Sequence, residues 1–207
     1  PIVIIFMREN MNTRVRGRKD LENLTIPFIG EIPLFTRKKK GILGKKPQEV
    51  KAVIVKEGNR DIINEAFRVL RTNLEFMTGK DKTSNVIIMT SFNPGSGKSF
   101  LTMNIAVSLA IKGKKVLVID GDLRHASASS YIDSPDKGLS DYLGGRIDNL
   151  DEIIVPDPKH KSMDILPVGT IPPNPTELLF DERLKQTIDT VRAVSYTHLR
   201  AHETDQY

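Results

Sequence analysis

Apolar and polar residues alternate along the chain in blocks that differ in their period. Short apolar runs at residues 86–90, 116–119 and 163–167 predict strands, of the kind found in parallel sheets covered on both faces. Residues 59–77, 100–111 and 176–193 predict longer helices, and residues 137–145 a short one. Asp61 and Thr176 are the expected N-caps of the first and last long helices. Strands alternating with helices indicate an α/β fold.

A glycine-containing segment joins the first predicted strand to the helix at 100–111. Gly95 and Gly97 can direct backbone N–H groups toward one point, and the helix N-terminus adds its own. Lys98 supplies an ammonium group for phosphates and Ser99 a hydroxyl for Mg²⁺. Phe92 stands where the G-x-x-x-x-G-K-[ST] pattern of phosphate-binding loops begins with glycine, which is one departure from that pattern. The alternative to a phosphate-binding loop is a glycine-rich turn with an incidental lysine. The expected ATP-binding residues are Asn93, Pro94, Gly95, Ser96, Gly97, Lys98, Ser99, Phe100 and Arg124.

Two carboxylates end the second predicted strand. Asp120 and Asp122 would lie at the carboxyl edge of the sheet, where α/β proteins bind ligands. They could hold Mg²⁺ with its waters or accept a hydroxyl proton, whereas the alternative is a solvated Asp-Gly-Asp turn. The phosphate loop one helix upstream favours the metal site. We therefore expect Ser99, Asp120 and Asp122 to bind the metal, and Lys98, Asp120 and Asp122 to be catalytic. The expected fold is a P-loop NTPase-like parallel sheet with helices on both faces.

Charge is distributed unevenly over the 207 residues, whose net charge is +5. Residues 1–60 hold 14 Lys or Arg against 6 Asp or Glu, whereas the remainder is slightly acidic. A nucleic-acid binder usually carries its basic excess on the folded domain, so no nucleic-acid partner is expected. The chain has no cysteine, which excludes disulfides and thiolate metal sites.

The first 58 residues differ from the rest of the chain. Residues 1–7 are apolar and basic residues follow them, an order that matches the end of a transmembrane helix with a cytoplasmic flank, although a short buried strand is the alternative. Residues 37–46 form a polybasic loop that could contact anionic lipid. We expect residues 1–58 to be a helix end with a basic juxtamembrane linker, and residues 59–193 to be the N-terminal part of a P-loop domain.

Charged residues recur every third position on the first long helix. Glu65, Arg68 and Arg71 predict a partly shared charged face. That face is either solvated or an interface with a neighbouring subunit.

Residues 194–207 lack the apolar character of a buried strand. They look like read-through from a cloning or sequencing adapter, and we expect them to be a foreign tail.

Five blocks together resemble the bacterial tyrosine kinase (BY-kinase) domain of the polysaccharide copolymerase, or chain-length-determinant, family of capsular exopolysaccharide systems. They are residues 93–99, the carboxylates and arginine at 120–124, the Glu65-Arg68-Arg71 spacing, Gly138–Leu143 and residues 172–179. The resemblance covers about residues 1–193. In that family the first two blocks are called Walker A and Walker A′.

The resemblance implies an ATP-dependent protein-tyrosine autokinase that regulates the chain length or export of an extracellular polysaccharide. Lys98 would stabilise the transferring phosphate, Ser99 and Asp120 would handle Mg²⁺, and Asp122 would accept the tyrosine proton. Glu65, Arg68 and Arg71 would join subunits into a ring. The implied location is the cytoplasmic face of the bacterial inner membrane, beside anionic lipid and the polysaccharide export and polymerisation machinery.

Departures from the family pattern leave two other functions open. No apolar strand ending in Asp (Walker B) follows residue 193, and no tyrosine cluster is present, so we expect this fragment to be inactive. ParA/MinD-like ATPases share the fold, but their early phosphate-loop lysine is replaced here by Asn93. A membrane-tethered scaffold whose assembly depends on nucleotide is the third reading.

Overall fold

In the computed structural model, residues 17–21, 25–34, 53–78, 86–193 and 197–201 are described. The predictions for residues 1–7 and for the polybasic loop at 37–46 concern residues outside these ranges. Within them, no helix combines the length and apolar character needed to cross a bilayer.

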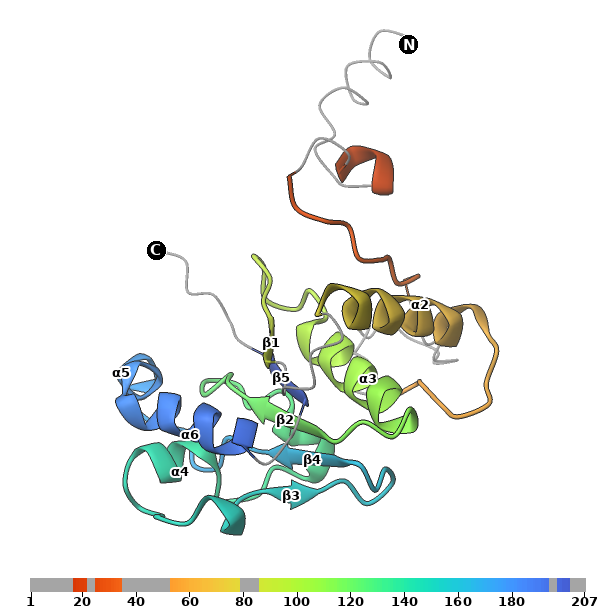
Figure 1. Cartoon of the computed structure of the whole chain (residues 1–207). Coiled ribbons are helices and arrows are strands. Elements are labelled where there is room, and N and C mark those ends of the chain that lie inside the picture. The colour runs from red at the N-terminus through yellow and green to blue at the C-terminus, as the bar shows by residue number, and fades with distance from the viewer. Residues whose placement is uncertain (1–16, 22–24, 35–52, 79–85, 194–196, 202–207) are drawn as a thin grey trace, which may run out of the picture.

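The sheet confirms the predicted α/β class and contains two strands that the apolar pattern did not predict, β3 and β5. Its order is β1-β5-β2-β4-β3, and the central strands β5, β2 and β4 are parallel (Figure 1). The elements are β1 (Val86–Met89), β2 (Val116–Asp120), β3 (Val155–Pro156), β4 (Met163–Leu166) and β5 (Thr197–Ala201). β1 is also parallel to β5, and only the short edge strand β3 is antiparallel to its neighbour.

β5 corrects the expectation that residues 194–207 cannot form a strand. Thr197 pairs with Val116, and Ala201 pairs with both Met89 and Asp120, so β5 fills the space between β1 and β2. The apolar pattern missed β5 because backbone hydrogen bonding to two neighbours can hold a polar sequence in a sheet. The foreign origin of this segment stays a prediction.

Helices cover both faces of the sheet. α3 (Lys98–Ile111) lies against β2, β4 and β5, and α2 (Ile62–Met77) packs on α3 as an outer layer (Figure 1). Alternate β2 residues face the two cores: Val116 and Val118 join the cluster of α2 and α3, and Leu117 and Ile119 join the other. That second core contains α4 (Leu139–Leu143) and α6 (Glu182–Ala193). The short 3₁₀ helices are η1 (Arg18–Leu21), η2 (Ser129–Ile132) and η3 (Leu150–Glu152).

The predicted cap of the first long helix is confirmed. Asp61 is extended and its carboxylate accepts a hydrogen bond of 2.8 Å from the N–H of Asn64.

The helix predicted from Thr176 is instead two helices. α5 (Pro175–Phe180) begins after Asn174, which occupies the N-cap position, and α6 follows. Asp181 between them is extended, and its side chain accepts a 2.8 Å hydrogen bond from the N–H of Arg183. An aspartate that can cap a new helix competes with continuation of the old one, which explains the break.

Candidate nucleotide site

The phosphate loop takes the conformation that its glycines allow. Gly95 has φ 72° and Gly97 has φ 91°, in the left-handed region that disfavours residues with a Cβ atom. Gly97 is the N-cap of α3 and provides no side-chain cap, so the first N–H groups of the helix have no capping acceptor. No atom lies within 4 Å of the place where a Cβ on Gly97 would stand. An uncapped helix N-terminus beneath open space fits a phosphate group.

Lys98 is held over the loop by a nearby hydroxyl. Its Nζ donates to Ser91 Oγ at 3.2 Å, and that hydroxyl donates to the carbonyl of Asn93 at 3.0 Å. The hydroxyl of Ser96 also bonds to the carbonyl of Asn93. Residues 93–96 are exposed, whereas Lys98 and Ser99 are half-buried. These local contacts give the loop its shape without a ligand.

Phe100 contributes differently from the other predicted nucleotide-binding residues. Its ring packs edge-on against Phe67 of α2, with centroids 6.0 Å apart, and belongs to the core beneath the helix. Only its main-chain N–H, in the first turn of α3, is placed to face a phosphate.

Asp120 ends β2 in a fully buried position. Its Oδ2 accepts hydrogen bonds from the N–H of Ser129 at 2.6 Å and from Ser129 Oγ at 2.7 Å, and its Oδ1 accepts one from the N–H of Asp122 at 3.2 Å. Burial raises the pKa of Asp120 from 3.8 to about 6, because desolvation outweighs the hydrogen bonds from Ser129, and the nearby charge of Asp122 adds to the increase.

Asp122 lies nearer the surface and keeps 8% of its area exposed. Its Oδ1 accepts from the N–H of His125 at 3.1 Å, and its Oδ2 accepts from Ser127 Oγ at 3.2 Å. Arg124 is exposed on the same turn. Of the two carboxylates, Asp122 is therefore the one that an incoming group can reach.

The sheet brings the phosphate loop and the acidic turn to one edge. Met89, the last residue of β1, and Asp120, the last of β2, both pair with Ala201 of β5. Adjacent strands lie about 4.8 Å apart, so the backbones at Met89 and Asp120 are separated by about 10 Å. This spacing leaves room for a phosphate chain and its metal between the two loops.

The acidic turn fits a magnesium ion that takes most of its ligands from phosphate and water. No cluster of three or more Asp, Glu or His side chains able to hold a metal occurs in the described ranges. Mg²⁺ is commonly bound through one or two carboxylates together with substrate phosphates. Ser99 and the pair Asp120 and Asp122 supply that kind of set.

Sequence analysis did not identify Ser129. This residue is almost fully buried on η2, and besides its two bonds to Asp120 its Oγ accepts a 2.9 Å hydrogen bond from the N–H of Val168. The hydroxyl thus ties the acidic turn to the loop after β4. Ser129 lies in an irregular polar stretch with no periodic signal, so nothing in the sequence marked it.

A second buried carboxylate, that of Asp141, also binds the loop after β4. Asp141 Oδ2 accepts hydrogen bonds from the N–H of Gly138 at 3.0 Å and of Thr170 at 3.1 Å. A Cβ on Gly138 would lie only 2.3 Å from the carbonyl oxygen of Pro167, so this close approach requires glycine. The Gly138–Leu143 block therefore fixes the position of the loop that follows β4, through the hydrogen bonds of Asp141 and the close backbone approach at Gly138.

The structure separates the three residues predicted to join subunits. Arg68 Nη1 lies 2.6 Å from Glu65 Oε1, and both side chains are nearly half exposed. Arg71 is only 6% exposed and donates instead to the carbonyl of Ser108 at 2.9 Å and to Ser108 Oγ at 3.1 Å, within its own chain. The expectation that Arg71 lies on an exposed charged face is therefore wrong, because its position on α2 turns it onto α3.

Comparison with known families agrees with this geometry. The model of the CobQ/CobB/MinD/ParA nucleotide binding domain matches residues 87–199. The tyrosine-protein kinase etk of Escherichia coli (strain K12) is 31% identical over 196 residues, which is 89% of this chain and 27% of that protein. The tyrosine-protein kinase wzc of Salmonella typhimurium is 32% identical over 197 residues, covering 90% of this chain and 26% of that protein. The chain thus spans about a quarter of the length of these curated relatives.

Solved structures show the same relation. The kinase domain of Escherichia coli tyrosine kinase ETK superposes with a TM-score of 0.78 at 28% identity, covering 92% of this chain and 74% of that one. The septum site-determining protein MinD complexed with Mg-ADP, from Pyrococcus horikoshii, gives a TM-score of 0.50 at 27% identity over 59% of this chain and 51% of that one. The likeness to the tyrosine kinase is thus the more extensive.

Proposed function

Because the chain belongs to the CobQ/CobB/MinD/ParA nucleotide-binding domain family, we propose that it is the nucleotide-binding part of an ATP-dependent protein-tyrosine autokinase. The observation that carries the proposal is the similarity to tyrosine-protein kinases along about nine-tenths of the chain. The fold agrees with it, since the phosphate loop and the acidic turn meet at one sheet edge. The resemblance drawn from the motifs is confirmed, while the activity of the whole protein remains our proposal.

The proposed roles follow from position. The glycine loop and the first turn of α3 would bind the phosphates of ATP, and Lys98 would neutralise charge on the transferring group. Ser99 and Asp120 would orient Mg²⁺, which when bound offsets phosphate charge. Asp122, the more accessible carboxylate, would accept the proton of the tyrosine hydroxyl. Phosphoryl transfer needs mainly positioning and charge stabilisation, so this small set suffices in kind.

A ParA/MinD-like ATPase is the second candidate. Its support is the shared family and the likeness to the MinD structure. Asn93 stands where that class carries its early lysine, and the TM-score to the ETK kinase domain is higher, so the kinase is favoured. A non-catalytic scaffold would bind nucleotide equally well, and only phosphotyrosine formation distinguishes it from a kinase.

The biological setting that we propose comes from the relatives and from the N-terminal residues. A parent protein regulating extracellular polysaccharide chain length or export would place this domain at the cytoplasmic face of an inner membrane. Residues 1–7 and the basic segment at 37–46 would then contact the bilayer and its anionic lipid.

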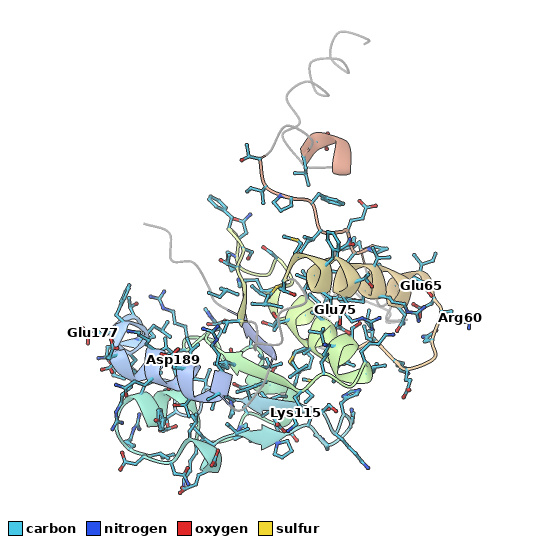
Figure 2. The ribbon with its side chains drawn as sticks, in the orientation of Figure 1. Arg60, Glu65, Glu75, Lys115, Glu177 and Asp189 are labelled. Carbon is cyan, nitrogen blue, oxygen red and sulfur yellow. The ribbon has the colours of Figure 1, made fainter. Side chains whose placement is uncertain are left out.

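Mutation of Lys98 tests nucleotide binding and phosphoryl transfer together. In the full-length parent, Lys98→Met should abolish autophosphorylation and weaken Mg-ATP binding, because the phosphates lose their mobile cation. Calorimetry and a phosphotyrosine blot measure the two effects. Lys115→Met, at an exposed position immediately before β2, is the matched control (Figure 2). Unchanged binding and labelling in the Lys98 variant would refute the proposed site. If the variant loses nucleotide binding but the wild-type parent never phosphorylates tyrosine, the ATPase and the scaffold remain as the candidate functions.

Oligomerisation should depend on Arg68 more than on Arg71. Arg68 and Glu65 are accessible to a neighbouring subunit, whereas Arg71 is committed to Ser108 of its own chain. Light scattering on the parent's cytoplasmic domain should show a smaller mass for Arg68→Ala. An unchanged mass would mean that this helix face is only solvated.

A further inference from the structure

A cavity of about 370 Å³ lies far from the phosphate loop, at the other end of α3. The segment 55–58, α2 and the C-terminal end of α3 enclose it. α3 has 14 residues, so Lys112 after its end is about 20 Å from the loop at its start. The cavity is therefore separate from the proposed ATP site.

Its floor contains a buried cation without an anionic partner. Arg71 is 6% exposed and lines the cavity, yet its hydrogen-bond acceptors are the neutral carbonyl and hydroxyl of Ser108. Its Nε is buried and has no hydrogen-bond partner. No carboxylate within the described residues forms an ion pair with it, and Glu75, one turn along α2, acts only at longer range. Burying a charge that no carboxylate pairs with directly is costly, so this site favours an anion.

The rim of the cavity adds further positive charge. Lys56 and Lys112 line it, are exposed, and have no ion pair within the described ranges. Arg68 also lines it, but is already paired with Glu65. Glu57 is the acidic residue in the lining, so cations outnumber it. Asn64 and Ser108 add neutral polar groups that suit a hydrogen-bonding ligand.

We propose that this cavity binds a phosphate group, either as inorganic phosphate or carried by a small molecule. Lys56 and Lys112 hold the phosphate from the rim, and the guanidinium of Arg71 supplies the buried positive charge below it. Lysine and arginine are the usual partners of phosphate oxygens. The volume is that of a small-molecule pocket and exceeds what one phosphate fills, which leaves room for an attached organic group.

The test must separate this cavity from the phosphate loop. Calorimetric titrations of the 207-residue chain with inorganic phosphate and with ribose 5-phosphate are therefore made in a Lys98→Met background. Binding should persist there and weaken at least about tenfold when Lys56→Gln and Lys112→Gln are added, because two charge-assisted contacts are lost. Lys114→Gln with Lys115→Gln, which together remove an equal charge outside the cavity, should leave the affinity unchanged. Tighter binding of ribose 5-phosphate than of phosphate identifies the carried form, and the reverse identifies the free ion.

Two results would overturn the proposal. The first is that no phosphate binding survives Lys98→Met, or that the rim variants bind as well as their background. The second is that phosphate does not bind but Lys56→Gln with Lys112→Gln lowers the mass in light scattering. That outcome would assign the cavity to an acidic group of a second copy of the chain.

Discussion

The buried carboxylate of Asp120 makes the stability of the domain depend on pH in a predictable direction. Its pKa is raised by burial to about 6, above the ordinary 3.8. A group whose pKa is higher in the folded state contributes stability that is fully present below the unfolded pKa and is lost as pH rises through the folded pKa. The wild-type domain should therefore lose stability between about pH 4 and about pH 6 through this residue.

The size of the effect follows from the pKa difference. A difference of roughly 2 units, at about 1.4 kcal/mol each, corresponds to about 3 kcal/mol of unfolding free energy. Asp120→Asn removes the titration but keeps an oxygen that can accept from the N–H of Ser129. Relative to wild type, the variant should gain about 2–3 kcal/mol on going from about pH 4 to about pH 8, because the unfolded carboxylate is already partly ionised at the lower pH. The fixed cost of replacing one acceptor oxygen by NH₂ cancels in this comparison.

Urea unfolding at about pH 4 and about pH 8, without Mg²⁺ or nucleotide, measures this difference. Asp189→Asn, exposed on α6, is the matched control and should show no such change (Figure 2). If the free-energy gap between wild type and Asp120→Asn is the same at both pH values, then Asp120 is ionised as easily in the folded chain as in the unfolded one. The reasoning from burial would then be wrong.

Two further variants test buried hydrogen bonds between side chains and the main chain. Ser129→Ala should cost about 1–3 kcal/mol, because the N–H of Val168 loses its buried acceptor, whereas Ser130→Ala, at a half-buried hydroxyl, should cost less in the same urea experiment. Asn104→Ala should cost about 2–4 kcal/mol, because Asn104 Oδ1 accepts from the N–H groups of Ile54 and Val55, at 2.8 and 3.1 Å, and both would be left without it. A loss below about 1 kcal/mol in either would show that water replaces the missing acceptor.

The parts of the fold that the sequence predicted are those in which burial is uniform along an element. β2 is buried at all five positions, so its apolar run identifies it without reference to any neighbour. α3 is buried from Thr102 to Ala110, and its start is marked by the glycine that no other residue replaces cheaply. The positions of the phosphate loop and the acidic turn followed from these two elements, because parallel strands end at one edge.

The parts that were missed depend on contacts between distant segments. β5 is placed by backbone pairing with β1 and β2, which requires no apolar side chain and leaves no periodic signal. Ser129 is significant only because folding brings it against Asp120 and Val168. At Asp181, capping of a new helix competes with continuation of the old one, and the apolar pattern does not show which prevails.

Arg71 shows how a regular spacing can mislead in a definite way. Residues three apart on a helix are rotated by about 300°, so each successive member of the Glu65-Arg68-Arg71 series moves about 60° around the axis. Glu65 and Arg68 remain on the accessible side, but the next step places Arg71 beside the buried Phe67, where it contacts α3. A shared motif therefore contains two environments: a solvated ion pair that can exchange partners, and a buried cation held by Ser108. The first can contribute to contacts between subunits at little cost to the fold. An anion bound in the proposed cavity would neutralise the second, and it should then stabilise α2 against α3 without changing the surface that α2 presents.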